Sequence, residues 1–235
     1  MRFISIVIIA LVATTNAWDN NPPIPDRYPG SGVGEGSFKQ GIDIEVFYDL
    51  LCEGCQMHHP KFQQFLDMQF LDGTYRDAIS VKYNFFPLPY HHGSWIVTKL
   101  LPILVDKCLN GTQPCKYLDY IAYTLINQNT LLDNTASTEN QIIQSWTATV
   151  AKQFGLNQTE LLQVYDSKKD VHNSEMRTRQ YWKYAASRTV EGTPSAFVNG
   201  VKVQNVPFEA TEWAQLVSSI YNNRVKMPKE LVILE

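Results

Sequence analysis

Cys52 and Cys55, separated by Glu53 and Gly54, are the residues of this chain best suited to chemistry. The preceding segment, 42–48, alternates apolar residues and predicts a β-strand, and the following segment, 56–71, has helical apolar spacing. Cys52 would therefore stand at a helix N-terminus, where unpaired backbone N–H groups and the helix dipole favour a thiolate. Cys55 lies one turn further along, close enough to form a disulfide with Cys52. The pair thus has the arrangement that thiol–disulfide exchange requires.

Two other uses of this pair remain open at the level of sequence. Cys52 and Cys55 could form a static structural disulfide, or they could bind a metal together with His58 and His59. Adjacent histidines point to different faces of a helix, however, and an oxidising compartment favours disulfides over zinc thiolates. The redox interpretation is therefore preferred, and it requires no cofactor and no metal.

The N-terminal region predicts entry into the secretory pathway. Residues 1–17 combine a cationic start, an apolar stretch and small residues at the end, as in a cleaved signal peptide. Residues 18–40 are rich in Pro, Gly and Asn and predict a flexible leader. Asn110 and Asn157 lie in Asn-x-Thr sequences and are candidate glycosylation sites. The tail, 226–235, has no retention signal, so we expect a secreted glycoprotein or a protein of the secretory lumen.

The composition is that of an ordinary soluble domain, with 44% hydrophobic and 18% charged residues and a formal net charge of −3. No basic stripe is present, which argues against a nucleic-acid partner. After signal cleavage, no segment is long and apolar enough to predict a membrane span.

The order of predicted elements describes one α/β sheet interrupted by helices. Residues 79–86 predict a second strand, which a right-handed crossover would lay parallel to the first. Asn199-Gly200 between two short apolar runs predicts a type I′ hairpin. Helices are expected at 94–107, 116–132, 139–154, 159–167, 174–188 and 209–223. The expected parts are 41–92 (βαβ), 93–188 (helical insertion) and 189–225 (ββα).

These features resemble the DsbA-like branch of the thioredoxin superfamily over residues 42–224. The resemblance rests on the Cys-Glu-Gly-Cys sequence after a strand, on Gly192-Thr-Pro194 before the hairpin, and on the helices between them. The segment 86–92, Phe-Pro-Leu-Pro-Tyr-His-His, is similar to one in secreted eukaryotic DsbA-like proteins. The resemblance implies a thioredoxin-like fold with an inserted helical domain. It also implies that Pro194 is a cis-proline facing the sulfurs and that Thr193 offers backbone hydrogen bonds to a bound peptide.

The dipeptide between the cysteines, Glu53-Gly54, differs from the Pro-His of the bacterial oxidases in the branch that this chain resembles. Glu53 places a carboxylate beside Cys52, which disfavours the thiolate, whereas a histidine cation would assist it. We therefore expect a couple more reducing than that of the strong oxidases, with isomerase-like or reductase-like behaviour.

Other cysteine, histidine and acidic residues are expected to have structural or supporting roles. Cys108 and Cys115 flank a turn-rich loop and predict a structural disulfide. His91 and His92 follow the second predicted strand, at the sheet edge that carries Cys52, and one of them could contact substrate or tune the thiol. Glu45 could be a partly buried proton acceptor beneath the disulfide, as acidic residues are in several thioredoxin relatives, but a solvated edge position is preferred. His172 is expected on the surface.

The function predicted from the sequence is a secreted thiol–disulfide oxidoreductase that acts on cysteine-containing proteins. Cys52 would be the nucleophile and Cys55 the resolving thiol, with glutathione or another thiol as redox partner. The alternative is a non-catalytic thioredoxin-like peptide-binding or chaperone module. The lysosomal thiol reductases, a third class, expect a Cys-Gln-His-Gly stretch that this chain lacks. A glutathione-transferase-like use of the fold would leave Cys55 without a role.

Overall fold

The computed structural model describes residues 25, 28, 35–111, 115–133 and 136–226 of the 235-residue chain. The predicted signal peptide, most of the predicted leader and nearly all of the predicted tail lie outside the described residues. None of the described helices is both long and apolar enough to cross a lipid bilayer.

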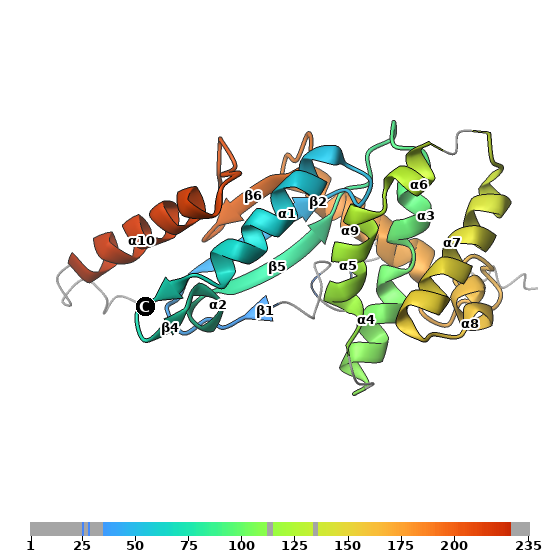
Figure 1. Cartoon of the computed structure of the whole chain (residues 1–235), viewed down its shortest axis with the longest axis horizontal. Coiled ribbons are helices and arrows are strands. Elements are labelled where there is room, and N and C mark those ends of the chain that lie inside the picture. The colour runs from blue at the N-terminus through green and yellow to red at the C-terminus, as the bar shows by residue number, and fades with distance from the viewer. Residues whose placement is uncertain (1–24, 26–27, 29–34, 112–114, 134–135, 227–235) are drawn as a thin grey trace, which may run out of the picture.

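The elements in chain order are β1 (Glu35–Gly36), β2 (Asp43–Tyr48), α1 (Glu53–Leu66), β3 (Gln69–Phe70), β4 (Gly73–Thr74), α2 (Tyr75–Ala78), β5 (Ser80–Phe85), α3 (Ser94–Thr98), α4 (Leu101–Leu109), α5 (Tyr117–Ile126), α6 (Asn129–Leu132), α7 (Glu139–Phe154), α8 (Gln158–Gln163), α9 (Ser174–Ser187), β6 (Ser195–Val198), β7 (Val201–Lys202) and α10 (Ala210–Lys226). The sheet and its helices form one half of an elongated molecule, and α3–α8 form the other (Figure 1).

The central sheet has the strand order β1-β5-β2-β6-β7. Strands β2 and β5 are parallel, as predicted, with Ile44 opposite Val81 and Val46 opposite Tyr83. Strand β6 joins the other edge of β2 in the antiparallel direction and continues into β7 through a tight hairpin. Asn199 (φ 49°) and Gly200 (φ 79°) both have left-handed backbone angles, as a type I′ turn requires.

Alternation along β2 divides the core into two layers. Ile44, Val46 and Tyr48 are buried in the larger cluster, which also receives side chains of α1 and α10. Phe47 points to the opposite face, where it packs with Phe197 and with Ala185 of α9. Helices therefore cover both faces of β2, which fixes the strand end from which the Cys-Glu-Gly-Cys segment emerges.

Several predicted helices are divided or shortened. The segment expected as one helix over 94–107 forms α3 and α4, and Pro102 stands in the first turn of α4. A proline lacks the N–H that would continue the preceding helix but is well suited to begin a new one. The segment 116–132 likewise forms α5 and α6. Four short elements were not predicted, because such short elements carry no periodic signal: the strands β1, β3 and β4 and the one-turn helix α2.

Glu45 is a correction to the sequence analysis. It was expected at a solvated edge, but its residue is only 7% exposed. Its carboxylate accepts hydrogen bonds from the hydroxyl groups of Tyr28 and Tyr184 and from the guanidinium of Arg188. The cause is tertiary: α9 covers this face of the sheet and supplies Tyr184, and the segment that follows it supplies Arg188.

Candidate active site

The Cys-x-x-Cys segment lies where β2 leads into α1. Helix α1 begins at Glu53, and Cys52 is its N-cap residue with an extended backbone (φ −87°, ψ 125°). The carbonyl of Cys52 accepts the N–H of Gln56 at 3.0 Å, which closes the first helical turn. The Cys52 sulfur therefore lies beside backbone N–H groups of the first turn that have no partner within the helix.

The two thiols have opposite acidities. Both are unbonded to other cysteines; Cys52 is 8% exposed and Cys55 is fully buried. The hydrogen bond from the Cys55 thiol lowers the pKa of Cys52 from 9.0 to about 6, against the opposing effect of burial. Burial in turn raises the pKa of Cys55 well above its ordinary value, and the shared hydrogen bond adds to this. The pair thus combines a thiolate near the surface with a buried thiol that keeps its proton.

A loop distant in sequence meets the Cys52 sulfur. The Thr193–Pro194 peptide bond is cis, and the Cys52 thiol donates a hydrogen bond to the Thr193 carbonyl at 3.2 Å. The Thr193 hydroxyl is buried and has no hydrogen-bond partner among the described residues, and it contributes to the lowered pKa of Cys52. A hydroxyl in this position can donate to the thiolate once the thiol proton has left.

Gly54 allows this close approach. A Cβ atom at position 54 would lie 3.1 Å from Cδ of Pro194 and 3.6 Å from the Cys52 sulfur. The absence of a side chain therefore lets the proline ring rest against the first turn of α1. Glu53, by contrast, is exposed and lies in this first helical turn.

A cleft of about 500 Å³ opens on the other side of the proline loop. It is bounded by residues 191–195 on one side and by β7 and the loop after it on the other. Its wall mixes charged and polar side chains, Glu191, Lys202 and Gln204, with the apolar Val206 and Phe208. Thr193, whose carbonyl accepts the hydrogen bond of the Cys52 thiol, is therefore also part of the cleft wall.

Asp49, the residue that follows β2, organises the region next to Cys52. Its backbone carbonyl accepts the N–H of Cys52 at 3.1 Å, and its buried carboxylate lies 2.5 Å from Nδ1 of His91. The Ser94 hydroxyl donates to the other carboxylate oxygen. The structure thus brings His91 to the sheet edge that carries Cys52 and Cys55 (the redox edge), whereas His92 beside it is exposed.

Comparison with solved structures identifies this architecture. A protein-disulfide isomerase of Pseudomonas syringae, described as putative, superposes with a TM-score of 0.61 at 16% identity, covering 78% of this chain and 96% of that one. Alpha-DsbA1 of Wolbachia pipientis superposes with a TM-score of 0.60 at 15% identity, covering 86% and 94%. The fold is the DsbA-like thioredoxin fold.

A thioredoxin-like oxidoreductase of Silicibacter pomeroyi is a more distant match, with a TM-score of 0.55 and 16% identity over 86% of this chain and 95% of that one. No protein-family model and no curated protein sequence matches the chain.

Within the DsbA-like fold, His58 and His59 are core residues. Nε2 of His58 accepts the Trp213 indole N–H at 3.1 Å, so Nδ1 carries the proton and donates to the Tyr48 hydroxyl at 2.7 Å. Burial lowers the pKa of His58 to about 3 and that of His59 to about 4. Among the described residues, no group of three or more His, Cys, Asp or Glu side chains could hold a metal ion.

The remaining predicted site residues lie in the helical half of the DsbA-like fold. Cys108 and Cys115 are joined by a disulfide with an S–S distance of 2.07 Å, between the end of α4 and the start of α5. Asn110 and Asn157 are exposed, and the Asn157 side chain also caps α8 by accepting the Thr159 N–H at 2.8 Å. His172 is not a free surface residue, because its ring is bound to Asp106.

Asp49 and Ser94 are functional candidates that the sequence analysis missed. One signal was available for Asp49: a single acidic residue stands between Phe47-Tyr48 and Leu50-Leu51, two apolar pairs that predict burial on both sides. A buried carboxylate requires compensating donors, so its presence next to the cysteines predicts a polar network there. No comparable local signal marks Ser94.

Proposed function

We propose that this protein is a thiol–disulfide oxidoreductase that acts on protein cysteines. The observation that carries the proposal is the unequal cysteine pair: the pKa of Cys52 is lowered to about 6, and Cys55 is buried with a raised pKa. The thiolate is the reactive form of cysteine, so roughly nine-tenths of Cys52 would be reactive at pH 7. A purely structural cysteine pair gains nothing from this asymmetry.

The proposed reaction takes place in two exchanges. The Cys52 thiolate attacks a substrate disulfide, an S–S bond to the near substrate sulfur forms, and the other substrate sulfur leaves as a thiolate. Cys55 then loses its proton and attacks the Cys52 sulfur, which forms the Cys52–Cys55 disulfide and releases the second substrate thiolate. The protein is oxidised by two electrons and the substrate disulfide is reduced to two thiols. The reverse sequence oxidises a substrate dithiol.

The cleft beside Pro194 supports a polypeptide substrate. The backbone of Thr193 lies between the cleft and the Cys52 sulfur, so an extended peptide that hydrogen-bonds to this loop would present its cysteine to the thiolate. The structurally similar proteins from Pseudomonas syringae and Silicibacter pomeroyi are described as a putative protein-disulfide isomerase and a thioredoxin-like oxidoreductase, and this agrees with the proposal.

The proposed couple is more reducing than that of the strong oxidases. A Cys52 pKa of about 6 lies between the values of about 3.5 for DsbA and about 7 for thioredoxin. The exposed carboxylate of Glu53 opposes further stabilisation of the thiolate. We therefore propose isomerase-like or reductase-like activity, with glutathione or another thiol as the redox partner. Equilibration with glutathione buffers, read by mass spectrometry, gives the potential; a value near that of DsbA contradicts this assignment.

We also propose that the protein acts in the secretory lumen or outside the cell. The proposal is supported by the sequence of residues 1–17 and by the exposure of Asn110 and Asn157, the two candidate glycosylation sites. Expression in a eukaryotic secretory host should yield medium-borne protein that lacks residues 1–17 and loses mass on endoglycosidase treatment. Retention in the cytosol with an intact N-terminus would contradict the assignment.

Single cysteine variants test the enzyme assignment. Cys52→Ser should abolish both insulin reduction and the refolding of a reduced disulfide-containing protein. Cys55→Ser should accumulate mixed disulfides with substrate at Cys52, because the resolving thiol is absent. Ser219→Ala, on the exposed side of α10 with its hydroxyl donated to the Leu216 carbonyl, is the matched control and should retain activity. A wild-type protein as inactive as Cys52→Ser would leave the peptide-binding or chaperone module in place of the enzyme.

A further inference from the structure

Asp49 is a fully buried carboxylate that is held by donors from three segments of the chain. One oxygen accepts the N–H of Leu51 at 3.0 Å and the hydroxyl of Ser94; the other accepts the N–H of Leu88 at 3.0 Å. These donors are neutral, and they leave the negative charge uncompensated in a site without water contact. The remaining donor is His91, which among the described residues is the one partner of Asp49 that can carry a positive charge.

The geometry fixes the orientation of the His91 ring. A carboxylate only accepts hydrogen bonds, so Nδ1 of His91, 2.5 Å from Asp49, carries the proton. The His91 side chain is 20% exposed, which leaves it partly shielded from water. The hydrogen bond that His91 donates to Asp49 raises the pKa of His91, and the negative charges of Asp49 and Cys52 raise it further against the effect of partial burial. Asp49 joins the two groups, because its backbone carbonyl accepts the N–H of Cys52 at 3.1 Å and its carboxylate lies 2.5 Å from the His91 ring.

In the described part of the chain, further titratable groups adjoin Cys52 and His91 in sequence. Helix α1 supplies the exposed Glu53 and the buried Cys55, and the loop of His91 itself supplies Tyr90 and His92, both exposed. The Tyr90 ring meets the His91 ring edge-on, with centroids 4.8 Å apart. Of these groups, Glu53 and His92 are in solvent, where water and salt weaken their effects on Cys52.

We propose that His91 provides the cation that stabilises the Cys52 thiolate, and that Asp49 is the positioning residue that holds this cation beside the sulfur. The Glu53-Gly54 dipeptide contains no positive charge, so the loop after β5 supplies it instead. This inference rests on the proposed function. His91 neither gains nor loses a proton in the exchange: when Cys52 attacks a substrate disulfide, the negative charge passes to the leaving substrate sulfur. The imidazolium therefore favours the reduced protein over the disulfide form.

The test is the pH dependence of iodoacetamide alkylation at Cys52, followed by peptide mass spectrometry from about pH 4 to about pH 9. His91→Asn keeps a neutral donor toward Asp49 and should slow alkylation at pH 6 by about three- to tenfold, with equal rates at pH 9. His92→Asn removes the adjacent exposed histidine and should leave the profile unchanged. His91→Lys, which restores a cation, should recover part of the lost rate.

A second measurement uses only the wild-type protein. The His91 ring should titrate at lower pH in the oxidised protein than in the reduced one, because the thiolate charge disappears when the Cys52–Cys55 disulfide forms. NMR titration of the ring protons in both redox states measures this directly. Equal midpoints, or a His91→Asn profile that coincides with wild type, overturns the inference and leaves the proposed function intact. A wild-type Cys52 that alkylates like free cysteine would instead refute the proposed function itself.

Discussion

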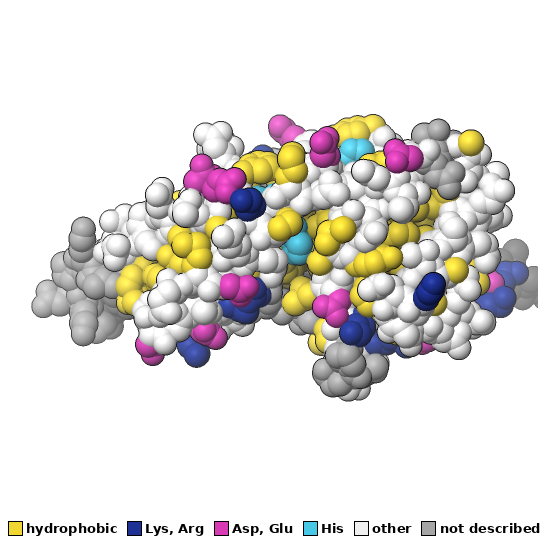
Figure 2. All heavy atoms as spheres, in the orientation of Figure 1, with side chains coloured by type: hydrophobic (Ala, Val, Ile, Leu, Met, Phe, Trp, Pro, Cys, Tyr) yellow, Lys and Arg dark blue, Asp and Glu magenta, His cyan; other side chains and the backbone are white. Residues whose placement is uncertain are grey.

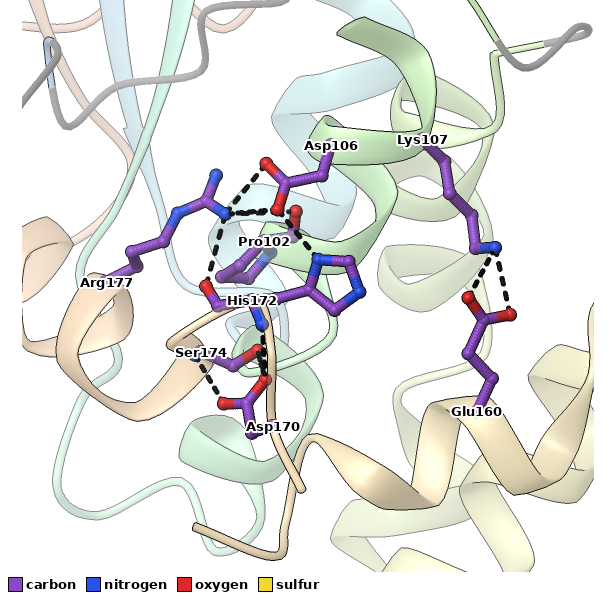
Figure 3. Close-up of polar contacts among 8 residues, drawn as sticks. All are labelled: Pro102, Asp106, Lys107, Glu160, Asp170, His172, Ser174 and Arg177. Carbon is purple, nitrogen blue, oxygen red and sulfur yellow. Dashed lines mark hydrogen bonds and ion pairs between the residues drawn. The ribbon is translucent and has the colours of Figure 1, made fainter. Parts of the chain in front are cut away.

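Each half of the molecule contains an aspartate–histidine pair, and the two pairs have different surroundings. At the redox edge, Asp49 is fully buried, and His91 is its one partner within the described ranges that can become charged. In the helical half, Asp106 of α4 lies 2.7 Å from Nδ1 of His172 but also accepts Arg177 of α9 at 2.9 Å with both oxygens (Figure 3). Arg177 is a permanent cation, so the charge of Asp106 is balanced at every pH.

The helical pair is part of a larger polar network that ties α4 to the start of α9. Arg177 also donates to the Pro102 carbonyl, and Asp170 accepts the N–H of Ser174 at 2.6 Å (Figure 3). On the next residue of α4, Lys107 forms a separate ion pair with Glu160 of α8 at 2.8 Å. These contacts join helices that are far apart in sequence.

The difference teaches that position, and not the residue pair, determines the role. A carboxylate with a permanent cation fastens helices, whereas a buried carboxylate with only a histidine can hold a charge next to a reactive sulfur. Hydrophobic side chains interrupt the polar surface along the boundary between the two halves (Figure 2). The comparison predicts that changes in the helical half alter stability, and that changes at the redox edge alter the acidity of Cys52.

The largest expected effect on stability comes from the disulfide of the helical half. Replacing both Cys108 and Cys115 by Ser should lower the free energy of unfolding by about 2–3 kcal/mol, because the short loop is no longer closed in the unfolded chain. Urea unfolding measures this. The alkylation profile of Cys52 should not change; a shift in that profile would break the proposed separation between the two halves.

A smaller loss of stability is expected for Asp106→Asn, about 2 kcal/mol, because Arg177 is left partly buried without its carboxylate. The matched control is Glu160→Gln, which breaks the more exposed Lys107 ion pair and should cost less than about 1 kcal/mol. Urea unfolding of both variants provides the comparison. Equal losses would show that Asp106 has no special role in joining α4 to α9.

At the redox edge, Thr193→Val should raise the pKa of Cys52 from about 6 by roughly one unit, because a methyl group replaces the hydroxyl that donates to the thiolate. Alkylation should slow near pH 6 and be unchanged near pH 9. The pKa of Cys52 is lower in the folded reduced protein than in the unfolded chain. The Cys52 thiolate therefore stabilises the fold fully above pH 9.0, and this stabilisation is lost as the pH falls through about 6. An alkylation profile equal to that of the wild type would show that the Thr193 hydroxyl does not stabilise the Cys52 thiolate.

The smallest expected effect is that of Glu53→Gln. Removing this exposed carboxylate should lower the pKa of Cys52 by only a few tenths of a unit, and the change should diminish in about 1 M NaCl. The alkylation profile at low and high salt measures it. A shift of a full unit, or one that is insensitive to salt, would mean that Glu53 acts through a structural contact and not through its charge in solvent.

Local patterns were sufficient to predict the scaffold of the site. The alternation of 42–48, the helical spacing after Cys55 and the Asn199-Gly200 turn are each encoded within a few residues, and β2, α1 and the β6–β7 hairpin match them. The division of the predicted helix 94–107 was missed although Pro102 is visible in the sequence, because a proline is compatible both with a kinked helix and with a new one.

The partners of the polar groups could not be predicted in this way. Glu45 lies 139 residues from Tyr184 in sequence, and the Cys52 thiol lies 141 residues from the Thr193 carbonyl that accepts its hydrogen bond. Asp49 meets Ser94 and His91 across 45 and 42 residues. Which of His91 and His92 turns inward depends on the packing of the loop after β5, for which no periodic pattern exists.

The sequence by itself determined that two cysteines stand between a strand and a helix, because backbone preferences and hydrophobic periodicity act over short distances. The tertiary structure alone decided how acidic the first cysteine is and what surrounds it. Acidity depends on burial, on hydrogen bonds and on charges within a few ångströms, and the groups that supply them come together only when the chain folds. For this reason Asp49, His91 and Thr193 acquire their roles from the fold, although each is an ordinary residue in the sequence.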